Sequence, residues 1–366
     1  MALKMDENTF LNFYADTMQG YSKAFRRYTL RIMEEKEFAS FDAQLKLPTE
    51  KSIPFLEKDS AISITTTDIK FSSFYEYLEF IKLYKYSVPF FYEIPNNKEL
   101  KAILDEKGYK LFDLKEFHPD FMLGTVIGEE SPIYFPDGDE TYIKFVLQKS
   151  YINPDSETVN YRFPIIIYIN IEKCFLEIRY DSTRYDPGFS IDSYSRLVFD
   201  CIDWLKNQLG LKLFICDHKD MISIVKENSD GSVKIYKQMM QLSSGGSAEL
   251  TASEQEDYVL PFIGELRELI DENEEIFNRC KDSRNLLLQY LDDKEATASY
   301  PYIYIKWVKP VESESYTVKV IFDYFNTKYT LMQHISGQCK DLGKERMNNA
   351  IKYLCESASF TKGDEI

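Results

Sequence analysis

The sequence lacks the short motifs that mark common catalytic and cofactor sites. It has three histidines and six cysteines, and neither HExxH nor a CxxC pair occurs, which argues against a dedicated zinc or other metal site. The glycine-rich phosphate loops GxxxxGK[ST] and GxGxxG are missing, as is the GxSxG turn of hydrolases. We therefore expect no metal and no cofactor, and we favour a non-catalytic protein while an enzyme stays an alternative.

Long apolar runs are missing as well. No window approaches the roughly 18 apolar residues of a membrane span, and the opening MALKMDENTF lacks the apolar stretch of a secretory signal. The cysteines are scattered, as expected for reduced thiols in the cytoplasm. The sequence therefore predicts a cytoplasmic protein without a membrane partner.

Glycine and proline are sparse, at 14 and 13 of 366 residues, whereas tyrosine and phenylalanine reach 27 and 26. An apolar share of 44% supplies ample core and excludes global disorder. The net charge of −16 disfavours non-specific binding to nucleic acid and anionic membranes. Such an acidic protein is either simply soluble or suited to a basic partner.

The apolar pattern predicts an α+β protein with mixed and antiparallel sheets, packed helices and more than one domain. Apolar residues three and four apart predict one long helix over Glu7–Glu37, within an N-terminal α/β domain of residues 1–130. Ala61–Thr67 alternates like a strand. In a central α+β domain, residues 131–242, the turn Pro136-Asp137-Gly138-Asp139 predicts a hairpin. Further strands and a helix are expected at Phe163–Ile171, Cys174–Tyr180 and Ile191–Gln208.

Residues 243–254, rich in small polar residues and glycine, are the predicted linker to a C-terminal domain of residues 255–366. There, apolar residues at steps of three and four predict one long heptad-like helix over 256–292, followed by strands and a helix. Its candidate interface seam consists of Ile263, Ile270, Asn273, Phe277 and Arg284. A coiled coil that makes a homo-oligomer is one interpretation, and a helix packed on the protein's own sheet is the favoured other.

The strand Cys174–Asp181 carries the first candidate site. Its alternation places Glu177, Arg179 and Asp181 on one face. Glu-x-Arg is similar to the Glu-x-Lys half of metal-dependent nuclease sites, where carboxylates hold Mg²⁺. Arginine is a poorer proton-transfer group than lysine, and the preceding strand offers only Asn170 as a partner. The favoured alternative is a solvated strand face with paired charges.

A basic stripe is the second candidate. Lys23, Arg27 and Arg31 lie four residues apart with Arg26 beside them and aromatic residues interleaved, an arrangement that can bind phosphates or an acidic partner. The favoured alternative is a solvated helix face with ion pairs along the helix. A third segment, Cys216-Asp217-His218, follows a predicted strand, but side chains so close in sequence usually point apart, which disfavours a nucleophilic pair.

Three functions remain as hypotheses. The leading one is a non-catalytic cytoplasmic subunit or adaptor of a multiprotein assembly that binds another macromolecule. Frequent lysine, isoleucine, tyrosine and asparagine suggest an AT-rich bacterial or phage genome, which is compatible with a role in host–phage conflict or antiviral defence. The alternative is a nucleic-acid-binding protein or divergent metal-dependent nuclease that uses the basic stripe. A further alternative is an acidic inhibitor or immunity-type protein that blocks a basic site.

Overall fold

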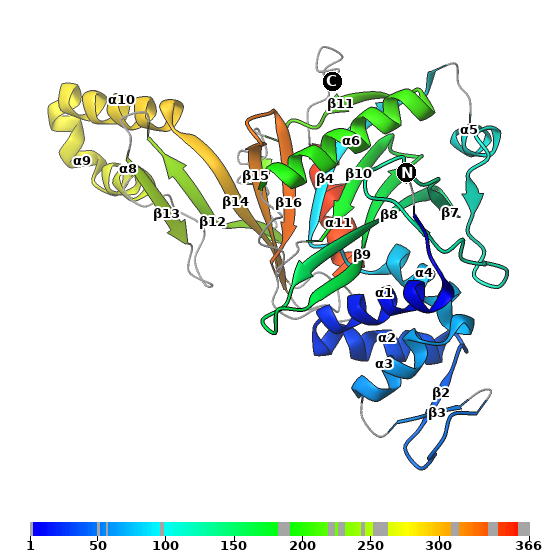
Figure 1. Cartoon of the computed structure of the whole chain (residues 1–366). Helices are drawn as coiled ribbons and strands as arrows, with labels where there is room; N and C mark the ends of the chain where they lie inside the picture. Colours follow the sequence, from blue (N-terminus) through cyan, green and yellow to red (C-terminus); the bar gives the residue numbers. More distant parts are fainter. Residues whose placement is uncertain are drawn as a thin grey trace. The chain divides into compact units, whose positions relative to one another are not determined.

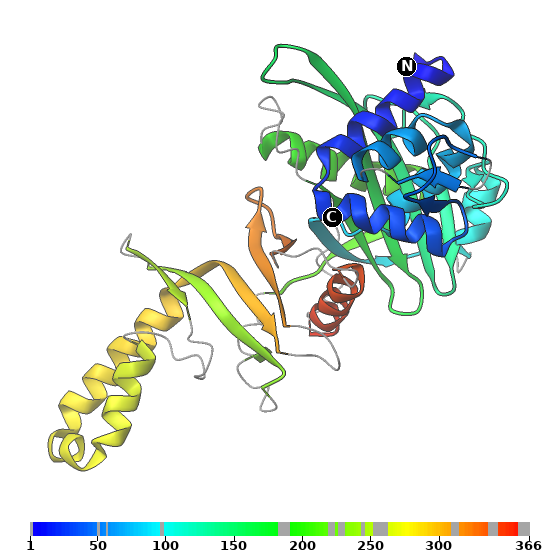
Figure 2. The same ribbon diagram turned by 90° about the horizontal axis from the view of Figure 1, so that it is seen from below.

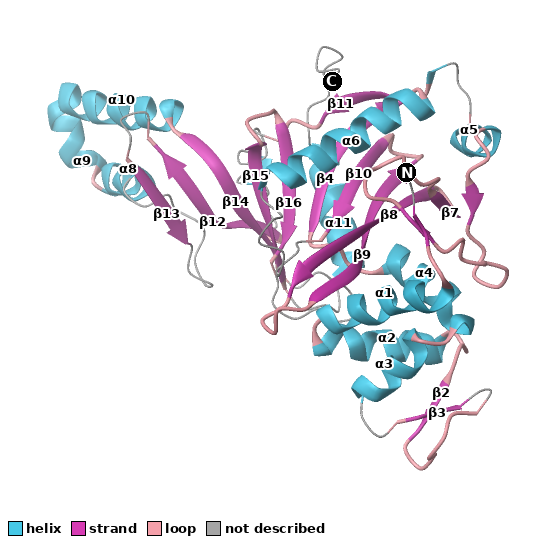
Figure 3. Ribbon diagram, viewed as in Figure 1, coloured by secondary structure: helices cyan, strands magenta, loops and turns pink. Residues whose placement is uncertain are grey.

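The computed structural model describes residues 3–49, 52–55, 58–95, 99–181, 191–218, 224–225, 231–242, 246–251, 263–308, 315–335 and 343–357. Helices and mostly antiparallel strands make up these residues, which confirms the α+β class (Figures 1 and 3). They fall into two compact units, one of Met1–Cys216 with Gly337–Cys355 and one of Asp217–Ser336. The predicted domain boundaries at 130, 242 and 254 stay predictions.

A mixed sheet organises the first unit. Its strands run in the order β11, β4, β10, β9, β8, β7, β5, and every pairing is antiparallel except the one between β5 and β7. Their bounds are β4 Tyr86–Glu93, β5 Lys110–Leu111, β7 Ile133–Asp137, β8 Glu140–Ile152, β9 Thr158–Asn170, β10 Phe175–Tyr180 and β11 Lys212–Ile215. The predicted hairpin is confirmed between β7 and β8, where Gly138 at φ +62° makes the turn.

Helices cover both faces of this sheet. Neighbouring strand residues point to opposite faces, and Tyr180 of β10 stacks on Tyr194 of α6 whereas Arg179 hydrogen-bonds Asn348 of α11. Helix α6 (Ile191–Leu209) therefore covers one face, and α11 (Gly343–Ser357) covers the other, together with α4 (Ser72–Ile81). The α6 face is apolar throughout its centre, with buried Ile143, Ile167 and Ile178 among others.

Smaller elements complete the first unit. They are α1 Glu7–Gly20, α2 Lys23–Glu35, α3 Lys58–Thr66, η1 Ile69–Phe71, α5 Leu100–Glu106 and the strands β1 Leu3–Lys4, β2 Ser40–Asp42, β3 Ser52–Pro54 and β6 Met122–Leu123. Two expectations were wrong here. The predicted helix Glu7–Glu37 is two helices, because the hydroxyl of Ser22 accepts from the Phe25 N–H and starts α2. The predicted strand at Ala61 is helix α3, whose threonine hydroxyls bond to carbonyls one turn back.

The second unit has an antiparallel sheet and a helical hairpin. Its strand order is β13 (Ser247–Thr251), β12 (Val233–Gln241), β14 (Ser299–Trp307), β15 (Tyr316–Tyr324), β16 (Tyr329–His334). The hairpin consists of α8 (Ile263–Glu272), α9 (Glu274–Phe277), η3 (Asn278–Cys280) and α10 (Lys281–Thr297). The helical character predicted for 256–292 is confirmed from Ile263 onward, and residues 256–262 lie outside the described residues. The expectation of a single long helix was wrong, because α8 ends before Asn273 and the chain reverses through α9 and η3, so that α8 and α10 lie side by side (Figure 2).

Within the described ranges, no helix combines the length and the apolarity needed to cross a membrane.

Candidate functional site

The charged face of β10 is buried. Glu177 is 0% and Arg179 is 5% exposed, and the guanidinium donates to both carboxylate oxygens at 2.9 and 3.0 Å. Ser87 of β4 donates to Glu177, and Arg179 also donates to Asn348. Burial alone would lower the pKa of Arg179, but Glu177 raises it above its usual value. The pair is therefore neutralised within the protein, and it lies under α11 instead of on the solvated face that the sequence suggested.

Asp181, the third residue of the predicted site, has a different environment. Its carboxylate accepts from the ammonium of Lys82 and, at 2.9 Å, from the backbone N–H of Lys85. The three predicted residues thus take part in two separate ion pairs. Because each carboxylate is already bound to a cation of the protein, this face offers no ready ligand set for Mg²⁺.

Sequence reasoning missed a buried ion cluster on the same face of the sheet. Glu76 and Glu79 of α4 meet Lys144 of β8 and Arg162 of β9, and all four are at most 6% exposed. Burial would raise the pKa of Glu79, but Arg162 and Lys144 together lower it to about 2. The two carboxylates and two cations balance in charge. Their ion pairs link α4 to β8 and β9.

A cleft lies along α6 in the first unit. It encloses about 660 Å³ between α6 and the segment from Val126 to Pro132. Trp204 forms part of its wall and packs edge-on against Phe145 at 4.9 Å. Glu130 and Asp200 also line it, and burial raises the pKa of Glu130 to about 7. The cleft is large enough to admit a small polar ligand.

The basic stripe lies along α2. Lys23, Arg27 and Arg31 are exposed on this helix, and Arg26 is half-buried. Arg31 forms an ion pair with Glu35 at 3.2 Å, one turn further along the helix. The stripe is therefore an exposed helix face that carries at least one ion pair along the helix, and its binding role stays a prediction.

The apolar seam of the long predicted helix is used within the hairpin. Ile270 and Leu291 are buried together, with Phe277 packed against them. Asn273 stands at the break between α8 and α9, where its amide donates to the Leu269 carbonyl. Arg284 lies 3.9 Å from Asp271. Ile263 begins α8, and its side chain is outside the described residues. A role of these residues at an interface with another chain stays a prediction.

One edge of the hairpin carries exposed apolar side chains. Leu269 is 49%, Leu286 is 69% and Tyr290 is 56% exposed. Arg267 of α8 pairs with Asp292 of α10 at 2.6 Å, which fixes how the two helices face one another. At about 100° per residue, the three apolar residues fall on the edge opposite this ion pair.

The same ion pair sets the level of each residue along the antiparallel helices. Arg267 is level with Asp292, so Leu269, two residues further on, is level with Tyr290. Leu286 follows one turn beyond, on the same side as Tyr290 because residues four apart share a helix face. We call Leu269, Leu286 and Tyr290 the hairpin patch. Its members alternate between two helices, which is why the seam pattern alone did not reveal it.

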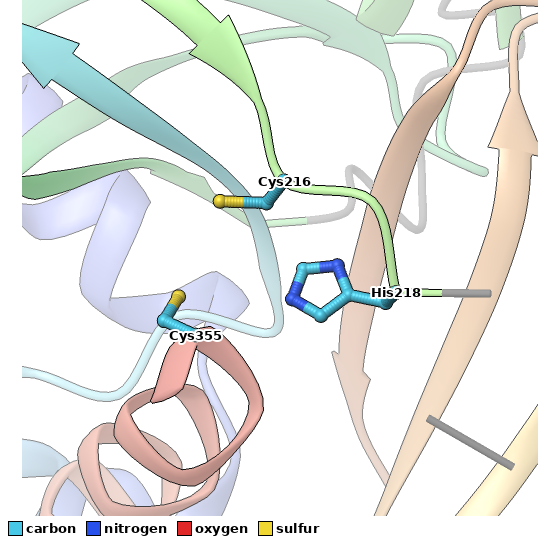
Figure 4. Close-up of side chains that lie close together, drawn as sticks. All are labelled: Cys216, His218 and Cys355. Carbon is cyan, nitrogen blue, oxygen red and sulfur yellow. The ribbon is translucent and has the colours of Figure 1, made fainter. Parts of the chain in front are cut away.

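Two cysteines and a histidine come together near the end of β11. Cys216, His218 and Cys355 are buried, and their donor atoms all lie within 4.8 Å of one another (Figure 4). The sequence suggested that Cys216 and His218 point apart, and it gave no sign that Cys355 would lie beside them.

No protein-family model matches the chain, and no curated protein matches its sequence.

Proposed function

We propose that the protein works by binding another protein, and that the hairpin patch is its contact surface. The observation that carries this proposal is the exposure of Leu269, Leu286 and Tyr290 along one edge of a single helical hairpin. Single exposed apolar residues are normal on any surface. Large apolar residues gathered on one edge are a recurrent feature of protein interfaces, where tyrosine is enriched.

The apolar contribution of the patch is modest. Complete burial of a leucine stabilises by about 1.5–3 kcal/mol, and these side chains are already about half covered, so a partner gains roughly 3 kcal/mol from all three together. Association costs at least about 4 kcal/mol in lost freedom of motion. A stable complex therefore needs further contacts, and the charge around the patch decides which kind.

The two helices that carry the patch, α8 and α10, are acidic together, and most of the excess lies on α8. Helix α8 holds one basic residue, Arg267, and the acidic residues Glu265, Glu268, Asp271 and Glu272. Helix α10 is nearly balanced, with the basic residues Lys281, Arg284 and Lys294 and the acidic residues Asp282, Asp292, Asp293 and Glu295. A partner with an apolar centre and a basic rim complements this surface, and opposite charges also speed association. The acidic inhibitor or immunity-type protein is one form of the same proposal, because its target would be basic.

A second copy of the chain suits the patch less well. Two hairpins docked through the same edge would bring two acidic surfaces together, in a chain whose net charge is already −16, and like charges across an interface are unfavourable. A homo-oligomer through residues 256–292 is therefore the weaker form of the proposal. A cytoplasmic location and a role in bacterial host–phage conflict remain expectations that rest on composition.

The test compares the protein with a variant that carries Leu286→Ser and Tyr290→Ser. The matched control is Ile152→Ser, which removes a similarly exposed apolar residue, 69% exposed, from the first unit. Immobilised proteins are incubated with extract of the source cells, and bound proteins are identified by mass spectrometry and then purified. We expect one basic protein whose affinity falls about 10–100-fold with the double variant and is unchanged with the control.

Two results would contradict the proposal. One is a purified partner that binds the double variant as tightly as the unaltered chain. The other is self-association, measured by sedimentation velocity, that disappears in the double variant, because the patch would then bind a second copy. Binding to the basic partner should also weaken as salt is raised, since exposed charges are screened.

Nucleic-acid binding is the second candidate function. The observation in its favour is the exposure of Lys23, Arg27 and Arg31 along α2. Four-residue spacing aligns them on one face, where they can contact phosphates. The ion pair between Arg31 and Glu35 and the acidity of the chain reduce the field that this stripe presents, so we rank the function second.

A further inference from the structure

The three side chains Cys216, His218 and Cys355 form a compact set of metal-ligand atoms. Cys216 directly follows β11, and Cys355 lies in the last turn of α11; both belong to the first compact unit. His218 stands two residues after Cys216, so the chain itself keeps its imidazole near that thiol. In Figure 4 the two sulfur atoms and the imidazole ring surround a common space.

We propose that this cluster binds one Zn²⁺ ion through the two thiolates and the imidazole. Sulfur and imidazole ligands select zinc and similar soft or borderline ions, whereas Mg²⁺ and Ca²⁺ require oxygen ligands. Both cysteines are thiols, and all three residues are buried, so the site excludes most of the water that competes for the ion. Two cysteines and one histidine are an established zinc ligand set that leaves a fourth position for water or another ligand.

The observed spacing requires only a small contraction. With Zn–S bonds of about 2.3 Å, tetrahedral coordination places two sulfur atoms about 3.8 Å apart. A sulfur and an imidazole nitrogen would lie about 3.5 Å apart in the same geometry. The donor atoms here lie within 4.8 Å of one another, so the sulfur pair must close by at most about 1 Å and each sulfur–nitrogen pair by at most about 1.3 Å. Rotation about the side-chain bonds of two cysteines and one histidine can supply this movement without a change in the backbone.

Zinc binding at this site has a defined proton balance. Each cysteine loses its S–H proton to solvent when the Zn–S bond forms, and neutral imidazole binds without proton loss. Two protons are therefore released for each Zn²⁺ bound. At pH values where both thiols are protonated and the imidazole is neutral, the apparent affinity should rise about 100-fold for each pH unit, as expected for two protons. A site made of carboxylates would show almost no such dependence near neutral pH.

The experiment uses the full chain, reduced and stripped of metal with a chelator. Co²⁺ is titrated first, because it replaces Zn²⁺ and gives thiolate charge-transfer bands in the near ultraviolet, and Zn²⁺ is then added in competition. The site variants are Cys216→Ser, His218→Ala and Cys355→Ser. The control variants are Cys174→Ser and Cys280→Ser, because both cysteines are exposed and lie outside the cluster.

We expect one Co²⁺ per chain, displaced by one Zn²⁺, with the charge-transfer bands reduced in both cysteine site variants. Loss of a ligand should weaken zinc binding by at least about 100-fold, more than the loss of a residue that only supports a ligand. Excess Zn²⁺ should raise the Tm of the unaltered chain and of both controls, since a ligand of the folded state stabilises it.

Three outcomes would overturn the proposal: no bound metal in the reduced chain, bands that are lost in the Cys174 or Cys280 control, or an affinity that does not depend on pH. The last two outcomes are measured on the control variants and on the unaltered chain. They therefore test the proposal even where a site variant fails to fold. Circular dichroism of each metal-free variant shows which of them has kept its structure.

Discussion

Replacement of Arg162 by methionine is the sharpest test of the buried ion cluster. Arg162 is 2% exposed and donates to Glu79 at 2.8 and 2.9 Å and to Glu76 at 2.7 Å. Methionine is of similar length, so it fills much of the same space. The substitution removes one of two cations and leaves two buried carboxylates with Lys144 alone.

The magnitude follows from the burial of the cluster. Breaking a buried ion pair by removing one partner costs about 3–5 kcal/mol, because a buried charge is left without compensation. The pKa of Glu79 agrees in direction, since burial would raise it but Arg162 and Lys144 together lower it to about 2. We expect Arg162→Met to lower the free energy of unfolding by about 3–5 kcal/mol at pH 7.

The pH dependence has a definite sign. A carboxylate whose pKa is lower in the folded state contributes stability that is present above its unfolded pKa and is lost as the pH falls through its folded pKa. For Glu79 this window lies between about 4.5 and about 2. In the variant the pKa of Glu79 is lowered less. The difference in stability between the two proteins should therefore shrink as the pH falls below about 4.5.

The assay is urea unfolding followed by tryptophan fluorescence. The chain has two tryptophans, Trp204 in the first unit and Trp307 in the second. In a Trp307→Phe background, Trp204 reports on the unit that holds the cluster.

The double variant Arg162→Met with Glu79→Gln restores charge balance in the cluster. Its loss in free energy of unfolding should be smaller than the sum of the losses in the two single variants. Arg31→Met, at an exposed ion pair, is the control and should change stability by less than about 0.5 kcal/mol. A loss below about 1 kcal/mol for Arg162→Met at pH 7 would refute this account of the cluster.

Two further predictions concern the cleft and the basic stripe. Burial raises the pKa of Glu130 from 4.5 to about 7, so the folded protein binds more protons and loses stability as the pH rises through this window. Glu130→Gln should remove that loss. The free energy of unfolding of the variant, relative to that of the unaltered protein, should be about 1–3 kcal/mol higher at pH 8 than at pH 4.5. Stability profiles that run parallel for the two proteins across this pH range would contradict the prediction. The double variant Arg27→Glu with Arg31→Glu should bind DNA and RNA as the unaltered chain does, measured by fluorescence anisotropy at low salt. A large drop in affinity, together with a smaller dependence of affinity on salt, would favour the nucleic-acid function instead.

The sequence predicts those parts of the fold whose local signals agree. The β7–β8 hairpin combines strand residues with a turn in which Gly138 takes φ +62°, which glycine adopts without strain. Helix α6 has a clean apolar stripe and a glycine stop. Helix α3 was predicted as a strand because Ile62 and Ile64 alternate with polar residues over a short stretch, and two periods are hard to tell apart within nine residues.

The hairpin shows why an apolar period does not settle topology. One apolar seam fits both a helix that continues and a helix that folds back on itself, because each half of the seam can pack against the other. Its members Leu266, Ile270, Leu287 and Leu291 pack together within the hairpin. Asn273, a polar residue of the predicted seam, stands between α8 and α9, and its amide donates to the Leu269 carbonyl. The chain then reverses through α9 and η3, and no apolar period marks that reversal.

The sites depend on contacts that local sequence does not encode. A strand with Glu177 and Arg179 at alternate positions looks like a half-solvated face until α11 brings Asn348 over it. Cys355 belongs to the same helix and lies beside Cys216. Helix α11 therefore covers the charged pair at one point and supplies a thiol at another, although it follows the whole second unit in the chain. The cover over Arg179 and the Cys355 thiol of the proposed zinc site therefore both require the chain to return to the first unit after residue 336.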